Sequence, residues 1–279
     1  MNNTLFLIHG YLPAEFMSTV IIPLVKDKKG DLSDVNNYRP IALTTIISKL
    51  FELIILEKCS DYFYTSDHQF GFKKGHGTEE CIFTMKQVIE YYTLNSSPVY
   101  LCFMDLSKAF DMVNHDELFS VLYNRGIHYF IVRILHKWYV SQKFMIKWGY
   151  GTSKAFSVSN GTRQGSILSP YLFNIYIDEL SGRLQTAAIG CHINATCFNH
   201  LLYADDSVLL APSPRAMQSL INLCSKFATE KYLVYNRKKT KIMMLVPNSR
   251  KNLVCPTFFI DGAPIQQVKK VIFRLLYQH

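Results

Sequence analysis

The sequence predicts an α+β fold. Amphipathic helical patterns and short apolar strand patterns are mixed along the chain without the regular alternation of a doubly wound parallel sheet. Its 49% apolar and 18% charged content exclude a disordered protein. No internal repeat and no Gly/Ser-rich or Pro-rich linker marks a boundary, so we expect the 279 residues to form one continuous fold with lobes.

The first half of the chain contains predicted helices on both sides of an apolar strand. Apolar residues at helical spacing predict a helix over residues 41–58, and two glutamates after Thr78 predict the start of a helix over 78–93. The run from Val99 to Met104 predicts a buried strand. The elements expected next are helices at 115–124 and 128–140 and strands near 143–148 and 154–159.

The second half repeats this mixture. Ser169 and Pro170 suit the start of a helix, because serine can cap it and proline is tolerated in its first turn. Two apolar runs joined by a polar tip predict a β-hairpin over 200–210. A helix at 214–231 and a strand at 240–246 complete the predicted elements.

Charge and cysteine usage narrow the class of protein. Lys plus Arg is 30 and Asp plus Glu is 21, and the net charge of +9 suits a polyanionic partner without identifying one. The seven scattered cysteines form no C-x-x-C pair and indicate reduced thiols. Cys191, His192, Cys197 and His200 could supply zinc ligands, but their spacing matches no familiar zinc pattern, and ordinary strand or loop residues are the alternative.

The sequence predicts neither a membrane span nor a secretion signal. No run of about twenty apolar residues predicts a membrane span, and the N-terminus has neither a basic segment nor a cleavage site. We therefore expect an intracellular protein of the nucleus or cytoplasm, neither secreted nor bound to membrane.

Three aspartates stand at the ends of predicted core strands. Asp105 follows the apolar strand, and Asp205 and Asp206 form the tip of the hairpin. Each position alone suits a strand end or a turn. If the strands are neighbours, however, three carboxylates converge, and a divalent cation would relieve their repulsion. Ligands that are all oxygen favour Mg²⁺ or Mn²⁺, and such a site can hold two ions.

The residues around these aspartates resemble motifs A, B and C of reverse transcriptases. The matching segments are Phe103-Met-Asp-Leu-Ser-Lys-Ala-Phe-Asp111, Gly161-Thr-Arg-Gln-Gly-Ser-Ile-Leu-Ser-Pro170 and Tyr203-Ala-Asp-Asp206. Flanking segments are similar to the fingers and motif D of the non-LTR (LINE-type) retrotransposon branch: Asn37-Tyr-Arg-Pro-Ile41, Gln69-Phe-Gly-Phe-Lys-Lys-Gly-His76 and Asn236-Arg-Lys-Lys-Thr240. The resemblance covers roughly residues 10–270.

The resemblance implies the fingers and palm of a right-hand polymerase, with an antiparallel palm sheet backed by helices. It assigns 1–98 to the fingers region and 99–270 to the palm, with a helical insertion at 112–141. The tail, 271–279, diverges from the family where Tyr-Leu-Gly is expected, and the thumb is expected to be missing.

The resemblance also implies an RNA-directed DNA polymerase that adds dNTPs to a DNA primer 3′-hydroxyl on an RNA template, with two Mg²⁺ or Mn²⁺ ions. Asp105, Asp205 and Asp206 would hold the metals, and the Leu106 carbonyl is a further ligand by analogy. The implied nucleotide-binding residues are Phe110, which would exclude a ribose 2′-hydroxyl, Gln164 and Gly165 beside the nucleotide and template, Arg39 and Lys73 near phosphates, and Lys239 as the proton donor to pyrophosphate.

Each assignment has a simpler alternative. Phe110 could be an aromatic residue of the core, and each lysine or arginine could be a solvated surface residue. Lys73 stands where the family has arginine, and Tyr232 where a glycine opens motif D. The alternative function is a truncated non-catalytic remnant that at most binds nucleic acid. A fold kept only as a scaffold for protein interactions would require dispensable aspartates, and nothing in the sequence supports it. The sequence indicates no oligomeric state.

Overall fold

The computed structural model describes residues 10–269, which contact one another in two compact units. Among these residues, unit 1 comprises 10–64 and 110–176, and unit 2 comprises 65–109 and 177–269. Each unit is therefore built from two separate chain segments. This division does not follow the boundary expected at residue 98, so the assignment of fingers to 1–98 and palm to 99–270 remains an interpretation of motif order. The tail at 271–279 lies outside the described residues.

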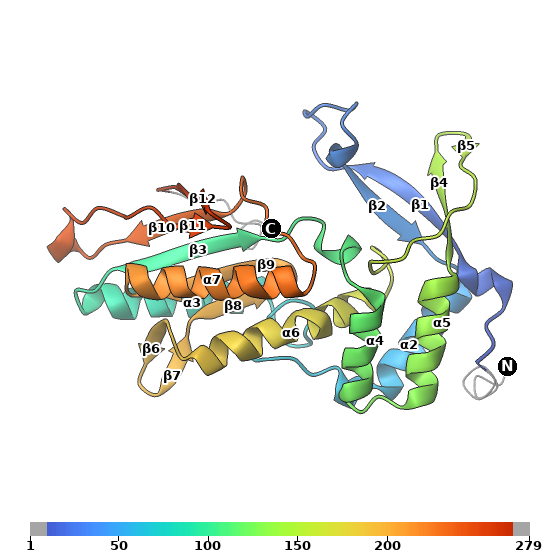
Figure 1. Ribbon diagram of the computed structural model, residues 1–279, viewed down its shortest axis with the longest axis horizontal. Coiled ribbons are helices and arrows are strands. Elements are labelled where there is room, and N and C mark those ends of the chain that lie inside the picture. Colours follow the sequence, from blue (N-terminus) through green and yellow to red (C-terminus); the bar gives the residue numbers. More distant parts are fainter. Residues whose placement is uncertain (1–9, 270–279) are drawn as a thin grey trace. The chain divides into compact units, whose positions relative to one another are not determined.

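Unit 1 contains a four-stranded sheet in the order β2-β1-β4-β5 (Figure 1). Its strands are β1 (Ser18–Val25), β2 (Tyr38–Leu43), β4 (Lys143–Trp148) and β5 (Gly151–Thr152). β1 is antiparallel to β2 and parallel to β4, with Ile21 opposite both Ala42 and Ile146.

This sheet corrects two expectations. Residues 41–43 belong to β2 and not to a helix, because pairing with β1 satisfies their backbone groups and overrides the helical spacing of their side chains. Residues 154–159 form no strand, and their pairing is limited to a bridge between Phe144 and Phe156. β5 precedes them, because the chain already reverses at Gly149.

Helices pack around a cluster of aromatic rings in unit 1. They are α2 (Ile46–Lys58), α4 (His115–Asn124), α5 (Tyr129–Ser141) and the first part of α6 (Ser169–Ala187). Thr45 caps α2 and Asn114 caps α4 through side-chain oxygens that accept backbone N–H groups. The fully buried Trp138 ring contacts Phe16 and Phe51 at centroid distances of 5.8 Å each. The predicted α4 and α5 are confirmed.

Unit 2 contains a five-stranded sheet with the order β13-β10-β3-β9-β8. Its strands are β3 (Val99–Asp105), β8 (His200–Tyr203), β9 (Asp206–Ala211), β10 (Lys241–Leu245) and β13 (Gln266–Gln267). The apolar run at 99–104 is the central strand and is buried throughout, as expected for a strand covered on both faces. The hairpin predicted over 200–210 is β8–β9.

Two helices cover the opposite faces of this sheet. α3 (Thr78–Leu94) packs with Leu101 and Phe103 in one apolar cluster. α7 (Pro214–Glu230) contacts β3 and β9, and both helices were predicted. Minor elements complete the chain: η1 (Ala14–Met17), η2 (Val35–Asn37), η3 (Ser60–Tyr62), η4 (Ala109–Asp111), η5 (Asn248–Arg250), β6 (Cys191–Ile193), β7 (Thr196–Phe198), β11 (Phe259–Ile260) and β12 (Ala263–Pro264).

The end of α7 shows why a glycine would suit position 232. The Leu233 N–H donates to the Ala228 carbonyl and the Tyr232 N–H to the Thr229 carbonyl, which is the bonding of a Schellman motif. Tyr232 occupies the left-handed position of this motif with φ of 57°, where glycine is favoured. Tyr232 is therefore a strained residue in an otherwise ordinary helix end.

Among the described residues, no helix is both long and apolar enough to span a bilayer. All seven cysteines are free thiols.

A buried ion pair joins α2 to the loop over residues 161–168. Arg163 Nη2 lies 2.7 Å from Glu52 Oε1, and the side chains are 2% and 0% exposed. The same carboxylate accepts hydrogen bonds from the Ser166 hydroxyl and the Ile167 N–H, at 2.7 and 2.9 Å. One buried glutamate thus organises a loop more than a hundred residues away in sequence.

Replacing Glu52 should destabilise unit 1, because Glu52→Ala leaves the buried Arg163 charge without its partner. We expect the free energy of unfolding to fall by about 3–5 kcal/mol in urea denaturation. Glu57→Ala, at an exposed position of the same helix, is the matched control and should change it by less than about 0.5 kcal/mol. Equal stability of the two variants would contradict this role of Glu52.

Candidate active site

The pairing of β3 with β9 places Asp105 directly opposite Asp206. The Asp105 carbonyl accepts from the Asn236 N–H on the other side of the strand, so the two aspartates form a pair without hydrogen bonds between their backbones. Such pairs have Cα atoms about 4.5 Å apart and side chains on the same face. Two of the three predicted carboxylates are therefore brought together by strand register alone.

Asp205 lies in the two-residue turn that joins β8 to β9. Tyr203 and Asp206 are the closing pair, and Ala204 has φ of 55°. A positive φ at the first turn residue alone is typical of a type II′ hairpin turn, which matches the strand twist. The turn places Asp205 next to Asp206 at the end of the sheet.

A loop before α3 braces this turn from the side. The side-chain oxygen Oε1 of the buried Gln69 accepts from the N–H groups of Gly71 and Ala204, at 2.9 and 3.0 Å. A Cβ added to Gly71 would lie 2.4 Å from the Ala204 nitrogen, so only glycine permits this approach. The position of the aspartate turn thus depends on a segment more than a hundred residues earlier.

A lysine ammonium lies beside the aspartate pair. Lys239 Nζ is 3.5 Å from Asp105 Oδ2, with the Asp105 side chain 21% exposed and the Lys239 side chain 63% exposed. The exposed lysine can leave this contact without breaking the core. Lys239 therefore supplies a cation next to the carboxylates and is available to other anions there.

The Leu106 carbonyl is directed to the same region. Leu106 bridges Tyr235, and the two hydrogen bonds of this bridge belong to Asp105 and Ser107. Because backbone groups alternate sides along an antiparallel strand, the Leu106 carbonyl points away from Tyr235, toward the side where β9 begins.

The donors at this end of the sheet are oxygens, which suit hard divalent cations. Within residues 10–269, no group of three or more His, Cys, Asp or Glu side chains is close enough to hold a metal ion. The aspartate pair and the Leu106 carbonyl nevertheless fit a cation that is also held by substrate oxygens, as Mg²⁺ commonly is.

Of the four residues that could supply zinc ligands, three have ordinary structural roles. His200 is fully buried, with its ring nitrogens 2.7 Å from Ser181 Oγ and 2.7 Å from Asn199 Oδ1. Burial lowers the pKa of His200 to about 3, so the ring is neutral at physiological pH. Cys191 and Cys197 belong to the β6–β7 hairpin, which agrees with the alternative of ordinary strand residues.

Four of the predicted nucleotide-binding residues lie in unit 1. The Gln164 carbonyl accepts from the Ala42 N–H at 2.7 Å, and Gly165 sits against the Ala42 carbonyl with φ of 103°. The turn of motif B is thereby joined to β2, the strand that carries Arg39. The Phe110 ring stacks on buried Phe173 at 4.5 Å and 20°, and its carbonyl accepts from the Thr162 N–H.

Lys73 is engaged within its own loop. Its ammonium lies 3.3 and 3.2 Å from the Thr65 and Ser66 carbonyls and 3.3 Å from Asp67 Oδ1. These bonds fasten the loop that carries Gln69, and a phosphate contact by Lys73 remains a prediction.

Sequence reasoning assigned no role to Gln69, Gly71, Glu52 or Arg163. The quoted motifs contain three of them, yet their function is visible only in the bonds that join distant segments. For Glu52, the only sequence feature that could have indicated its role is an acidic residue within an apolar helical pattern.

The chain matches known proteins over most of its length. A family described as "Reverse transcriptase (RNA-dependent DNA polymerase)" matches residues 26–273. The chain is 24% identical over 248 residues to a Pol polyprotein of the retrotransposable element R2 from Nasonia vitripennis, with 88% of the chain and 24% of the relative aligned. It is 27% identical over 242 residues to a probable RNA-directed DNA polymerase of transposon BS from Drosophila melanogaster, covering 82% of the chain and 26% of the relative.

Solved structures share the fold. Apo telomerase from Candida tropicalis, truncated from its C-terminal domain, matches with a TM-score of 0.59 at 11% identity over 92% of this chain and 54% of that one. Telomerase from Candida albicans matches with a TM-score of 0.55 at 10% identity, over 91% of this chain and 45% of that one. The chain thus spans about a quarter of the length of the curated relatives and about half of these structures.

Substitution of Gly71 should displace the aspartate turn. We expect Gly71→Ala to lower the free energy of unfolding by about 1–3 kcal/mol, because the new methyl group overlaps the backbone at Ala204. Hydrogen exchange at the amides of residues 204–206 should also become faster.

Gly182→Ala is the matched control, since its Cβ in α6 would meet nothing within 4 Å. Gly182→Ala should keep or raise stability, by up to about 1 kcal/mol, because alanine is favoured over glycine inside a helix. If Gly71→Ala likewise caused no loss of stability and no faster hydrogen exchange, the bracing of the turn would be disproved.

Proposed function

Since the chain belongs to the reverse transcriptase family, we propose that it carries out RNA-directed DNA synthesis as part of a non-LTR retrotransposon polymerase. The observation that carries this proposal is the register that sets Asp105 opposite Asp206, with Asp205 in the adjoining turn. The name of one relative, a probable RNA-directed DNA polymerase, supports the reaction class.

The proposed reaction is attack of a primer 3′-hydroxyl on the α-phosphate of a dNTP, with pyrophosphate as the leaving group. Asp105 and Asp205, with Asp206 beside them and the Leu106 carbonyl as a further ligand, would hold two Mg²⁺ or Mn²⁺ ions. When bound, such ions make the hydroxyl a better nucleophile and offset charge on the phosphates. The carboxylates are held in place for this role because the sheet and its turn fix their backbone positions.

Lys239 would act on the leaving group. Its exposed ammonium lies beside Asp105. It would move from this carboxylate to the pyrophosphate and there donate a proton or neutralise negative charge. Arg39 and Lys73 are proposed to contact phosphates of the nucleotide or template.

Phe110 would select deoxynucleotides. Its ring is backed by the buried Phe173 ring, so it is a stiff apolar wall. Such a wall rejects a ribose 2′-hydroxyl by contact and by leaving that group without a hydrogen-bond partner. Gln164 and Gly165 are proposed to pack against the nucleotide and the template, from a turn that is bonded to β2.

The proposed partners are an RNA template and a DNA primer. The net charge of +9 supports binding of a polyanion, and much of that binding should weaken with salt. We also propose an intracellular location, which the seven free thiols support.

Primer extension on an RNA template tests the proposal. We expect dNTP incorporation in the presence of Mg²⁺, and Asp205→Asn should reduce its rate by about 1,000-fold, since stabilisation by a metal site is worth several kcal/mol. Asp116→Asn, an exposed aspartate of α4 whose side chain is 92% exposed, should retain the activity.

Equal incorporation by the wild type and Asp205→Asn would refute this mechanism. Salt-sensitive RNA binding with no incorporation by the wild type would favour the alternative of a non-catalytic chain that only binds nucleic acid.

A further inference from the structure

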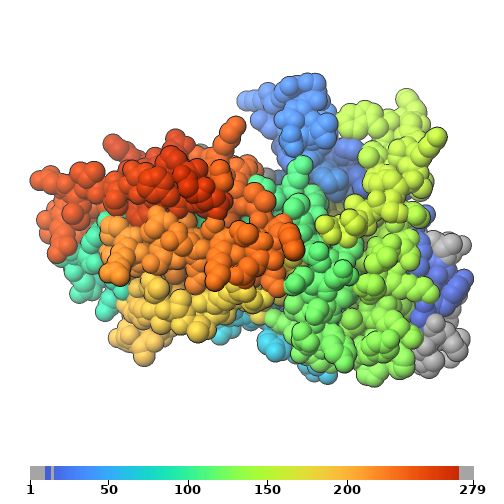
Figure 2. All heavy atoms as spheres, viewed as in Figure 1, coloured from blue at the N-terminus to red at the C-terminus, as the bar shows by residue number. Residues whose placement is uncertain are grey.

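The segment that begins at Phe110 is joined to the segment that leads into Gln164. The Phe110 carbonyl accepts from the Thr162 N–H, at 2.6 Å. The Val113 carbonyl accepts from the Gly161 N–H, at 2.7 Å. Figure 2 shows the two segments, in green and yellow-green, next to each other on the surface of unit 1. The residue proposed to exclude a ribose and the loop that carries Gln164 therefore form one structural piece.

Asp111 lies at a close approach between these segments. A Cβ added to Gly161 would lie 2.9 Å from the Asp111 carbonyl oxygen and 3.0 Å from its Cα, so only glycine permits the contact. The buried His115 ring holds the same glycine, because its Nε2 donates to the Gly161 carbonyl at 2.8 Å. The backbone of Asp111 is therefore fixed relative to the loop that follows Gly161.

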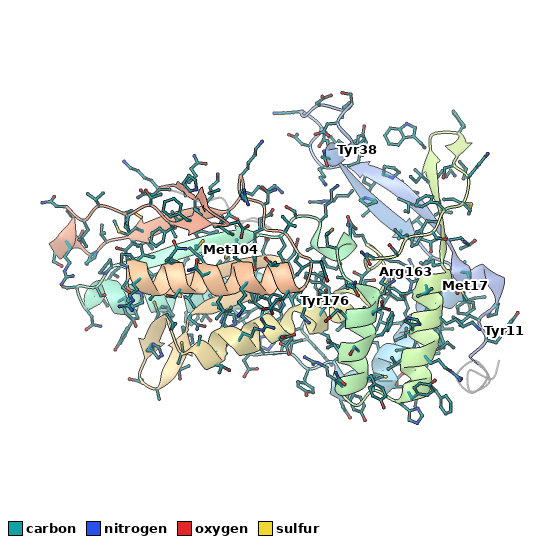
Figure 3. The ribbon with its side chains drawn as sticks, in the orientation of Figure 1. Tyr11, Met17, Tyr38, Met104, Arg163 and Tyr176 are labelled. Carbon is teal, nitrogen blue, oxygen red and sulfur yellow. The ribbon has the colours of Figure 1, made fainter. Side chains whose placement is uncertain are left out.

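The backbone of Gln164 is fixed as well. Its carbonyl accepts from the Ala42 N–H at 2.7 Å. The preceding residue, Arg163, is paired with Glu52, and its guanidinium lies 4.2 Å from the centroid of the Trp138 ring. Figure 3 labels Arg163 between the four-stranded sheet of unit 1 and α5. With its backbone held on both sides, Gln164 retains only the rotation of its own side chain.

The Asp111 carboxylate restricts this rotation. Gln164 Nε2 donates to Asp111 Oδ1 at 3.0 Å. An ionised carboxylate accepts hydrogen bonds and donates none, so the amide nitrogen of Gln164 faces it and the amide oxygen faces away. A hydrogen bond to a charged acceptor is also stronger than one between neutral groups. The amide is thereby held in one of its two orientations.

We propose that Asp111 is a positioning residue, which fixes the Gln164 amide before a nucleotide binds and turns its oxygen toward the bound nucleotide. The inference rests on the proposed function, in which Gln164 packs against the nucleotide and the template. A free glutamine side chain loses rotational freedom when a ligand orders it, and that loss weakens binding. Asp111 removes this cost in advance and so contributes to nucleotide affinity through Gln164.

Incorporation of a single dNTP on an RNA template tests the proposal. Asp111→Ala should raise KM for the dNTP by about tenfold and leave kcat within about twofold, since the lost bond affects ground state and transition state alike. Asp111→Asn keeps an acceptor oxygen and should restore most of the affinity. Asp116→Ala, which removes an exposed aspartate of α4, is the matched control and should behave like the wild type. An unchanged KM in Asp111→Ala would overturn the proposal.

A double-mutant cycle separates positioning from general damage. If Asp111 acts through Gln164, Asp111→Ala should raise KM no further in a chain that already carries Gln164→Ala. Effects that multiply would overturn the proposal. An altered preference between dNTP and rNTP in Asp111→Ala would also overturn it, because Asp111 would then act through Phe110.

Gln164→Glu covers the case in which Asp111→Ala does not fold, as judged by circular dichroism. It breaks the same bond from the other side, because two carboxylates repel. Adding Asp111→Asn to Gln164→Glu restores a donor for the new carboxylate, so KM should return toward the wild-type value. No recovery of KM in this pair would contradict the inference.

A measurement without substrate separates the inference from the proposed function. The side-chain amide signal of Gln164, identified in a ¹⁵N-labelled chain as the one that Gln164→Ala removes, should shift in Asp111→Ala toward the position of a solvated amide. An unchanged signal would overturn the positioning by Asp111, even in a chain that polymerises. A shifted signal in a chain that incorporates no dNTP would refute the proposed function and leave the positioning intact.

Discussion

The register between β3 and β9 is the constraint on which the candidate active site depends. A shift of one residue would turn every side chain of either strand to the opposite face of the sheet. Both faces are packed, against α3 and α7, so such a shift would exchange the side chains that each helix contacts and would place Asp105 and Asp206 on opposite faces. The burial of Leu101 and Phe103 therefore determines where Asp105 stands relative to Asp206. The chemistry of the site is specified by the packing of residues that never contact a substrate.

In each unit, a buried polar side chain from a distant segment holds a turn in place through hydrogen bonds. Each of these turns carries proposed site residues. In unit 2, Gln69 accepts from the backbone of the Asp205 turn, and in unit 1, Glu52 accepts from the loop that carries Gln164. A turn has few apolar side chains of its own, so hydrogen bonds from a packed element must hold it. These contacts explain why segments far apart in the sequence belong to one compact unit.

Much of the fold was predictable because its elements have strong periodicity. The run at 99–104 and the helix at 214–231 bury one face or both and carry patterns that local sequence displays. β1 and β2 were not predicted, because their strand character comes from pairing with each other and not from alternation. Asp105, Asp205 and Asp206 were found by their places at strand ends and by family resemblance. Gln69 and Gly71 were not assigned roles, because their importance lies in contacts with Ala204 that no local pattern reveals.

Binding of Mn²⁺, measured by electron paramagnetic resonance, tests most directly whether strand register builds a site for divalent cations. The account predicts that the wild type binds Mn²⁺ and that Asp105→Asn and Asp206→Asn each weaken this binding by about tenfold or more, because each removes an anionic oxygen donor. Asp116→Asn, which changes an exposed aspartate of α4, should bind like the wild type. Equal Mn²⁺ affinity in all four proteins would contradict the account, because the paired aspartates would then contribute nothing to cation binding.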